Sequence, residues 1–317
     1  MSEICVVIPY YQKTQEPLRK AIASILVQEG VPIPDILIVD DESPVPAAGI
    51  VEEHFPDHRG AIRIIMQKNS GAAAARNTAL DNLPEDAKYV AFLDSDDEWT
   101  PDHLANALKV MESGCDFYFA GHKREDWNHD RFTQMGLALG EHKCIDAERA
   151  LFEYAGDTLL SIVSKHMIKT SSVVLRRYGL EDIRFPEHLV LGEDDVFWVK
   201  ATRRARKTGF CSNVEVKMGD GVNISQGGEW GDERSIQLMA LNMLKWQSIP
   251  AMFPDEPQLE SIRKSKMAEL RHDLAGSVLH RIRRGQRLPM KQIAACTSAD
   301  PSWLFTLLQY PFRRNRT

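Results

Sequence analysis

The sequence predicts an α/β protein whose mostly parallel sheet is flanked by helices, and three observations support this prediction. Through roughly the first hundred residues, short β-branched runs alternate with longer segments of helical periodicity. The short runs are continuously apolar, as are strands buried on both faces of a sheet. Acidic and aromatic residues directly follow several runs, where an open parallel sheet places its ligand crevice. The alternation indicates a right-handed, doubly wound sheet.

The individual elements follow from these patterns in chain order. Strands are expected at 4–8, 35–40, 61–66 and 88–94, with helices at 16–28, 47–55 and 70–83 between them. Later in the chain we expect helices at 102–114 and 193–205 and strands at 115–123, 169–177 and 209–218. Residues 124–168 carry no clear pattern, residues 219–231 read as a Gly-rich loop, and a helical region is expected from there to about 284.

Composition excludes several classes of protein. The chain has 317 residues, of which 43% are hydrophobic, as is ordinary for a globular protein and unlike a disordered one. Its five cysteines are far apart and form no C-x-x-C pair, so a zinc knuckle, a redox motif and a secreted disulfide framework are not expected. No apolar run approaches the roughly 18 residues of a membrane span, and the start does not resemble a signal peptide. We therefore expect a cytoplasmic protein.

The densest charge cluster lies in the stretch FLDSDDEWTP, residues 92–101. Four acids fall within five positions after a predicted buried strand: Asp94, Asp96, Asp97 and Glu98. Asp94 and Asp96 form a D-x-D pair whose like charges would repel unless a cation lay among them. Carboxylate oxygens suit Mg²⁺ or Mn²⁺, which share their remaining ligands with substrate phosphates. The alternative is a solvated acidic turn before the next helix, but two other polar strand ends nearby favour the metal site.

Five motifs occur in the order and approximate spacing of a known family. They are VVIPYYQ (6–12), IVDDES (38–43), NSGAAAARNTAL (69–80), FLDSDDEWTP (92–101) and GEDDVFW (192–198). Over roughly residues 4–225 the chain resembles glycosyltransferase family 2, the inverting, nucleotide-sugar-dependent enzymes of the GT-A fold. The motifs are also similar to those of bacterial exopolysaccharide glucosyltransferases of the succinoglycan-assembly type.

The resemblance implies a division of the chain. A GT-A catalytic domain would cover 1–225, with a Rossmann-like nucleotide-binding half at 1–100 and an acceptor half at 101–225. A basic, helical C-terminal extension would cover 226–317.

The resemblance also assigns a donor site to residues that follow the first strands. Pro9 and Tyr11 would line a uracil pocket, and Asp41 would accept a hydrogen bond from the uracil ring. Arg76 would face the nucleotide from a helix whose cap would be the Asn or Ser at 69–70. The chain has no G-x-G-x-x-G or P-loop sequence, so dinucleotide-binding and ATPase functions are not indicated.

The acid cluster would hold the metal and the diphosphate. By resemblance, Asp94 and Ser95 would lie beside the ribose or the metal, and Asp96 would coordinate Mg²⁺ or Mn²⁺ directly. A divalent cation neutralises the charge that develops on a departing nucleoside diphosphate. Many family members carry a histidine as a further ligand where this chain reads KMGDGVNIS, so Asp220 is a candidate by position alone.

The GEDDVFW motif would supply the general base. By resemblance, Asp194 would take the proton from the acceptor hydroxyl, and Glu193 beside it would shape the acceptor site. Because Asp195 follows directly, the alignment of the three acids leaves room for a shift by one residue. The alternative is a group of acids that simply favours a helix N-terminus.

The C-terminal segment is basic. Residues 262–317 carry twelve lysines and arginines against three acids, whereas the whole chain has a net charge of −6. In PSWLFTLLQYPFRRNRT, apolar residues lie beside three arginines at the end of the stretch, as in a segment that lies on an anionic membrane surface. A tail packed on the protein or on a second copy in a homodimer is the alternative. The segment has no nucleic-acid-binding motif.

These features together predict an inverting, metal-dependent glycosyltransferase. It would move a sugar, with glucose as the best guess, from a UDP-sugar to a glycan or polyprenyl-linked acceptor in bacterial polysaccharide biosynthesis, in the cytoplasm or on the inner face of the cell membrane. A sugar nucleotidyltransferase is one alternative, although the stretch PYYQKTQEP lacks the Gly-rich basic loop of that class. A catalytically silent protein that binds nucleotide-sugars or glycans is the other.

Overall fold

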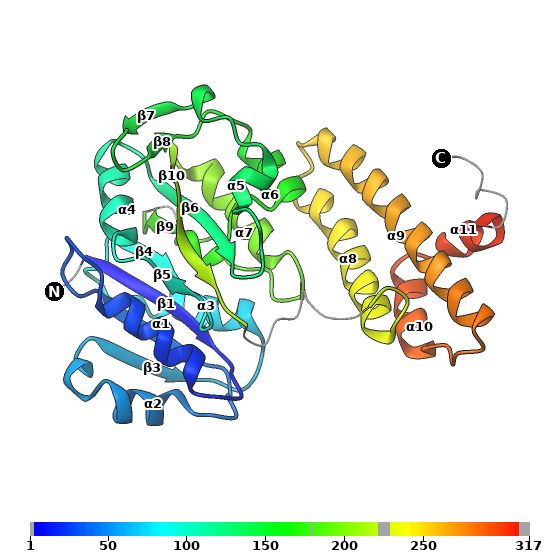
Figure 1. The fold of residues 1–317 in the computed structure, drawn as a ribbon, viewed down its shortest axis with the longest axis horizontal. Coiled ribbons are helices and arrows are strands. Elements are labelled where there is room, and N and C mark those ends of the chain that lie inside the picture. The colour runs from blue at the N-terminus through cyan, green and yellow to red at the C-terminus, as the bar shows by residue number, and fades with distance from the viewer. Residues whose placement is uncertain (1–2, 179, 221–228, 311–317) are drawn as a thin grey trace. The chain divides into compact units, whose positions relative to one another are not determined.

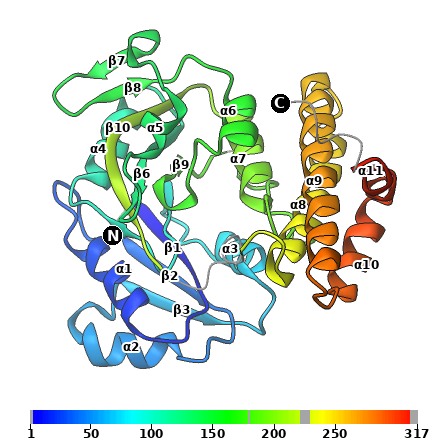
Figure 2. The same cartoon turned by 45° about the vertical axis from the view of Figure 1, so that its right-hand side comes forward.

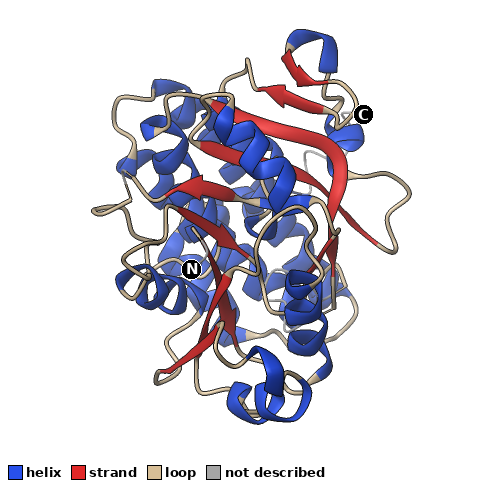
Figure 3. Ribbon diagram, turned by 90° about the vertical axis from the view of Figure 1, so that its left-hand side faces the viewer, coloured by secondary structure: helices blue, strands red, loops and turns tan. Residues whose placement is uncertain are grey.

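The computed structural model describes residues 3–178, 180–220 and 229–310. The chain forms two compact units, one of Met1–Glu187 with Glu193–Val222 and one of His188–Gly192 with Asn223–Thr317. Within the described part of the first unit lies a ten-stranded sheet with the order β3-β2-β1-β4-β9-β6-β10-β8-β7, and β5 pairs with β10 (Figure 3).

The first four long strands are parallel and lie where the sequence predicts them (Figure 1). They are β1 (Ile4–Tyr10), β2 (Asp35–Asp40), β3 (Ile62–Met66) and β4 (Tyr89–Phe92). The helices α1 (Glu16–Leu26), α2 (Ala47–His54) and α3 (Ala72–Asp81) connect them in turn. Because β1 pairs in parallel with both β2 and β4, the carboxyl ends of these strands meet at one edge of the sheet.

Helices cover both faces of the sheet, which explains why its inner strands β1 and β4 are largely apolar. Alternate residues of β1, including Val6 and Ile8, join one core cluster with α1, α2 and α4 (His103–Glu112). On the opposite face, Phe92 packs edge-on against Phe197 and Trp198 of α7 (Glu193–Arg204). Trp198 is fully buried, as expected of a core residue. The structure therefore confirms the predicted α/β layers.

The second half of the sheet mixes strand directions. Its strands are β5 (Glu98–Trp99), β6 (Phe117–Arg124), β7 (Lys143–Asp146), β8 (Leu151–Glu153), β9 (Val174–Arg176) and β10 (Thr208–Met218). The predicted strand at 169–177 is shorter than expected, because a 3₁₀ turn occupies Thr170–Ser172. This short β9 runs antiparallel to both β4 and β6. The beginning of β9 therefore lies at the same edge as the carboxyl end of β4.

The region without a sequence pattern is a set of short elements. It holds α5 (Arg131–Met135), a 3₁₀ turn at Leu139–Glu141, the β7–β8 hairpin and α6 (Thr158–Lys165). The hairpin extends the sheet, since β8 pairs antiparallel with β10.

The second unit is helical, and Figure 2 shows its helices lying side by side. They are α8 (Glu233–Met252), α9 (Pro257–Arg283), α10 (Met290–Ala299) and α11 (Trp303–Gln309). The predicted helical region is broken at 253–256, since Pro254 and Pro257 disfavour a continuous helix. Buried residues of this unit include Ile236, Leu274 and Trp303. Among the helices that the structure describes, none has the length and apolarity needed to cross a membrane.

Candidate functional site

The four acids of FLDSDDEWTP follow β4 at the edge where the parallel strands end. We call residues 94–97 the acid loop. Asp97 is buried, whereas Asp94 and Asp96 are each partly exposed. The backbone of Gly219, which follows β10, lies against the acid loop: a Cβ on Gly219 would stand 1.8 Å from the carbonyl oxygen of Asp96. Only a residue without a side chain allows this approach.

Two cations hold the carboxylate of Asp94. Arg76 Nη2 donates to Asp94 Oδ1 at 2.7 Å, and Lys169 Nζ donates to Asp94 Oδ2 at 2.8 Å. Burial acts to raise the pKa of Asp94, but Lys169 and Arg76 outweigh burial and hold that pKa well below its usual range. The repulsion expected within the acid loop is therefore relieved by the protein's own lysine and arginine.

Asp97 is fixed on the other side of Lys169. Lys169 Nζ lies 3.3 Å from Asp97 Oδ2, and the Ser171 hydroxyl donates to the same oxygen. The backbone N–H of Gly219 donates to Asp97 Oδ1 at 3.0 Å. Burial raises the pKa of Asp97, and Lys169 offsets part of that rise. Asp97 is thus a buried anchor that ties the acid loop to the segments before β9 and after β10.

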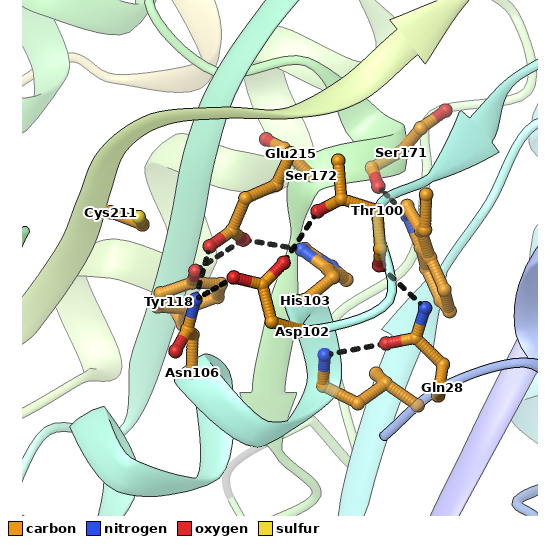
Figure 4. A network of polar contacts seen from close by, with 12 residues as sticks. Gln28, Thr100, Asp102, His103, Asn106, Tyr118, Ser171, Ser172, Cys211 and Glu215 are labelled. Carbon is orange, nitrogen blue, oxygen red and sulfur yellow. Dashed lines mark hydrogen bonds and ion pairs between the residues drawn. The ribbon is translucent and has the colours of Figure 1, made fainter. Parts of the chain in front are cut away.

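A buried polar network fixes the chain immediately after the acid loop (Figure 4). The carboxylate of Glu215 on β10 accepts from Tyr118 at 2.6 Å and from Asn106 at 2.7 Å, and lies 2.8 Å from His103 Nδ1. The backbone N–H of Thr100 donates to the Glu215 carbonyl at 2.9 Å. All four side chains of the network are almost completely buried. These shared contacts hold the segment in place, although His103 Nε2 is buried without a hydrogen-bond partner.

Asp41 performs a structural task that the sequence did not indicate. Its carboxylate accepts the backbone N–H groups of Ser70 and Gly71, each at 2.8 Å, at the start of α3. Gln67 donates to it as well, at 2.7 Å. The expected cap at 69–70 is wrong, because the residue before α3 is Gly71 and no side chain of its own segment caps the helix. A carboxylate from the end of β2 supplies the acceptor instead.

The remaining residues assigned to a donor pocket lie around the end of β1. Pro9 is half-buried, and Tyr11, one residue beyond the strand, is 37% exposed. Ser95 is buried and accepts a hydrogen bond from Gln12 Nε2 at 3.1 Å. Gln12 in turn exchanges two hydrogen bonds with Ser43, after β2. The structure thus links the ends of β1, β2 and β4 directly.

The three acids of GEDDVFW begin α7 and have different partners. Glu193 lies 3.4 Å from Arg76 Nη1, which connects it through that arginine to Asp94. Asp195 is buried and lies 3.5 Å from His166 Nδ1. Asp194, between them, is half-buried and accepts the backbone N–H of Asp195 at 2.9 Å.

Burial shifts the pKa of Glu193. Its surroundings and the charge of Asp194 raise the pKa of Glu193 to about 8, although Arg76 opposes the rise. Arg76 is itself almost fully buried, and its guanidinium lies over the ring of Phe185 at 5.3 Å. The D-x-D motif and the E-D-D motif therefore meet at one arginine.

The donor set fits a metal only in part. Across the described residues, no three His, Cys, Asp or Glu side chains are grouped so that they could hold a metal ion. Both oxygens of Asp94 are engaged by cations, and Asp220 forms an exposed ion pair with Arg124 at 2.6 Å. Mg²⁺ is commonly bound through one or two carboxylates together with substrate phosphates. The residues therefore fit a metal held by Asp96 and a diphosphate, but not one held by protein side chains alone.

Comparison with known proteins identifies the family. The family model for glycosyl transferase family 2 matches residues 5–180. The chain belongs to glycosyltransferase family 2. It is 33% identical over 305 residues to the succinoglycan biosynthesis protein ExoW of Rhizobium meliloti (strain 1021), an alignment that covers 93% of both chains. It is 35% identical over 120 residues, 38% of this chain and 46% of the other, to the putative teichuronic acid biosynthesis glycosyltransferase TuaG of Bacillus subtilis (strain 168).

Solved structures share the fold of this family 2 chain. S. aureus TarS 1-349 in complex with UDP-GlcNAc matches with a TM-score of 0.56 and 18% identity, covering 98% of this chain and 92% of that one. The mannosyltransferase PcManGT of Pyrobaculum calidifontis, in complex with GDP-Man and Mn²⁺, matches with a TM-score of 0.55 and 17% identity, covering 98% and 84%. These likenesses confirm the expected GT-A architecture with C-terminal helices.

Proposed function

We propose that the protein is an inverting glycosyltransferase that uses a UDP-sugar and a divalent metal ion in polysaccharide biosynthesis. One observation carries the proposal: Arg76 joins the acid loop at Asp94 to the E-D-D acids at Glu193, so both motifs meet at one edge of the sheet. Family membership supports the transfer of a sugar. The names of the relatives, a succinoglycan biosynthesis protein among them, support a polysaccharide product.

The donor would bind across the ends of β1, β2 and β4. Tyr11 offers a partly exposed ring on which uracil can stack, and Pro9 would line the same pocket. Asp41 accepts three hydrogen bonds from the protein, and a carboxylate has about four acceptor positions, which leaves one for the uracil N–H. TarS bound to UDP and to UDP-GlcNAc supports a uridine nucleotide, and glucose is our best guess for the sugar.

The diphosphate would lie over the acid loop. Asp96 would hold Mg²⁺ or Mn²⁺, which neutralises charge on the departing diphosphate. Asp94 would stay with Arg76 and Lys169 and present a fixed carboxylate to the ribose side. Because Ser95 is held by Gln12, the backbone of the acid loop is already ordered before a ligand arrives.

Asp194 would act as the general base toward the acceptor hydroxyl. Glu193 contacts Arg76 and Asp195 is buried beside His166, and we choose Asp194, which is partly exposed at the start of α7, as the base. A carboxylate that accepts the hydroxyl proton lets the oxygen attack the anomeric carbon opposite the departing diphosphate, and this inverts the configuration. Glu193 would shape the acceptor side through its contact with Arg76.

The acceptor is proposed to be a glycan or a polyprenyl-linked oligosaccharide at the inner face of the cell membrane. On α11, the side chains of Leu304, Phe305 and Leu308 are exposed, while Trp303 faces the protein. Four basic residues are exposed in and beside the α9–α10 connection: Arg283, Arg284, Arg287 and Lys291. No acid occurs at 274–299. The three arginines at 313–316, which the sequence also suggested for this contact, lie outside the described residues.

Vesicle sedimentation tests the membrane contact. Apolar residues beside basic ones suit an anionic surface, where each basic residue contributes about 1 kcal/mol. The protein should sediment with phosphatidylglycerol vesicles and not with phosphatidylcholine vesicles, and Phe305→Ser with Leu308→Ser should weaken binding. Leu244→Ser, on an exposed leucine of α8, is the control. If the protein instead forms a concentration-dependent dimer, and the same two substitutions make it monomeric, the homodimer alternative is supported.

Release of UDP from a panel of UDP-sugars, with Mn²⁺ or Mg²⁺ and lipid extract as acceptor source, tests the function itself. Metal-dependent release from one donor, lost in Asp96→Ala, supports the proposal and identifies the sugar. Binding without turnover would favour the silent nucleotide-sugar-binding alternative. Release of diphosphate from UTP and a sugar phosphate would favour the nucleotidyltransferase.

A further inference from the structure

Lys169 pairs with two acids of the acid loop. Its Nζ donates to Asp94 Oδ2 at 2.8 Å and lies 3.3 Å from Asp97 Oδ2. The side chain is 23% exposed, so it reaches the loop from a largely enclosed position just before the Thr170–Ser172 turn. Neither D-x-D nor E-D-D contains this residue.

The oxygens of the two acids around Lys169 are all engaged. Asp94 accepts from Arg76 on one oxygen and from Lys169 on the other. Asp97 accepts from the Gly219 N–H on one oxygen, while Ser171 and Lys169 share the other. The two cations match the two carboxylates in charge. Burial lowers the pKa of Lys169, but Asp94 and Asp97, and less strongly Asp96, raise it above its usual range.

A divalent ion that met this arrangement without a nucleotide would find few ligands. Coordination by Asp94 or Asp97 would bring the ion against an ammonium or guanidinium group that is already paired with the carboxylate. Lys169 would also repel the incoming ion across a short, poorly solvated distance. A nucleoside diphosphate changes the balance, because its phosphate oxygens supply both ligands and negative charge.

We propose that Lys169 makes metal capture depend on the nucleotide: by pairing with Asp94 and Asp97, it withholds these two carboxylates from the metal, which then binds only together with a diphosphate. The inference rests on the proposed nucleoside diphosphate site at Asp96. It assigns Lys169 a positioning role, because the lysine acts through the carboxylates that it holds and does not itself touch the reacting atoms.

Titration with Mn²⁺ alone, followed by loss of the free-ion electron paramagnetic resonance signal, tests this proposal without any turnover. The wild type should bind Mn²⁺ weakly without UDP and at least about tenfold more tightly with it. Lys169→Met should bind Mn²⁺ without UDP at least about tenfold more tightly than the wild type, because Asp94 and Asp97 each lose one cationic partner and the repelling charge is removed. Lys169→Arg should behave as the wild type. Lys165→Met, at an exposed lysine on α6, is the matched control.

Thermal melting provides a second readout and a folding control. Millimolar Mn²⁺ should raise the Tm of Lys169→Met and leave the wild-type Tm unchanged without UDP, since a ligand stabilises the state that binds it. Lys169→Gln, which keeps an N–H donor without a charge, replaces the Met variant if the latter does not fold. Two results would overturn the proposal. One is equal Mn²⁺ affinity in the wild type and the neutral variants, and the other is tight Mn²⁺ binding by the wild type without UDP. Absence of UDP binding by the wild type at any metal concentration would instead refute the proposed function.

Discussion

Gly219→Ala is expected to damage both stability and activity, because Gly219 touches the backbone of the acid loop. The added Cβ would lie 1.8 Å from the Asp96 carbonyl oxygen, whereas ordinary contacts begin near 3.4 Å, so the two backbones must part by roughly 1.5 Å. Overpacking of this kind typically costs about 1–3 kcal/mol. Separation also breaks the 3.0 Å hydrogen bond from Gly219 to Asp97, worth about 1 kcal/mol.

The loss is partly offset, because alanine reduces the entropy of the unfolded chain by about 0.4–1 kcal/mol. We therefore expect the free energy of unfolding to fall by about 1–3 kcal/mol. A shift of the acid loop by this distance should lower kcat by about 10²-fold, since catalytic groups tolerate little displacement.

Urea denaturation and UDP release measure the two effects of Gly219→Ala. Gly49→Ala is the matched control, because Gly49 lies inside α2 and an added Cβ there meets nothing within 4 Å. That control should be stabilised by about 0.5–1 kcal/mol and keep full activity. A Gly219→Ala protein as stable and as active as the wild type would refute the close approach of β10 to the acid loop.

Three further predictions concern the acids of the site. Asp194→Asn should lower kcat by about 10²–10⁴-fold, while calorimetry should still detect UDP binding. Asp195→Asn should lower kcat much less, and equal losses in the two variants would contradict the choice of base. Glu215→Gln should lower the free energy of unfolding by about 1–3 kcal/mol in urea, because three buried donors lose their shared carboxylate; an unchanged midpoint would speak against the network. Burial raises the pKa of Glu193 to about 8 from 4.5, so its contribution to stability is present below pH 4.5 and lost as the pH rises through 8. The side chain of Gln in Glu193→Gln stays neutral at every pH. The free energy of unfolding of this variant, relative to that of the wild type, should therefore increase by about 1–3 kcal/mol between pH 5 and pH 9. A difference that does not change with pH would contradict the raised pKa.

The parallel half of the fold could be predicted because its signals are local. Strands buried on both faces must be continuously apolar, and runs such as 4–8 and 36–39 meet this condition without reference to the rest of the chain. The convergence of polar residues at one sheet edge follows from parallel pairing alone. The ends of β1, β2 and β4 therefore lie together as expected.

The partners of the acids could not be predicted, because they depend on pairing between distant segments. Arg76 and Glu193 are 117 positions apart, and Lys169 reaches Asp94 across 75. Lys169 lies at this edge because β9 runs antiparallel to β4, and a three-residue strand carries no mark of its direction. The cap of α3 was misplaced for a similar reason, since its acceptor, Asp41, comes from another strand end. The sequence offered one sign of these partners, because the crowded acids at 94–97 require positive charge nearby. We interpreted that requirement as a metal ion, whereas Lys169 supplies part of the charge.

Calorimetric titration of UDP in the presence of Mn²⁺ tests most directly whether the acid loop is a nucleoside diphosphate site. The wild type should bind UDP, and Asp96→Asn should weaken that binding at least about tenfold, because it removes the proposed carboxylate ligand of the metal. Glu112→Gln, at the carboxyl end of α4, is the control and should bind as the wild type does. Equal affinity of the wild type and Asp96→Asn for UDP, or no binding of UDP at all, would contradict the assignment.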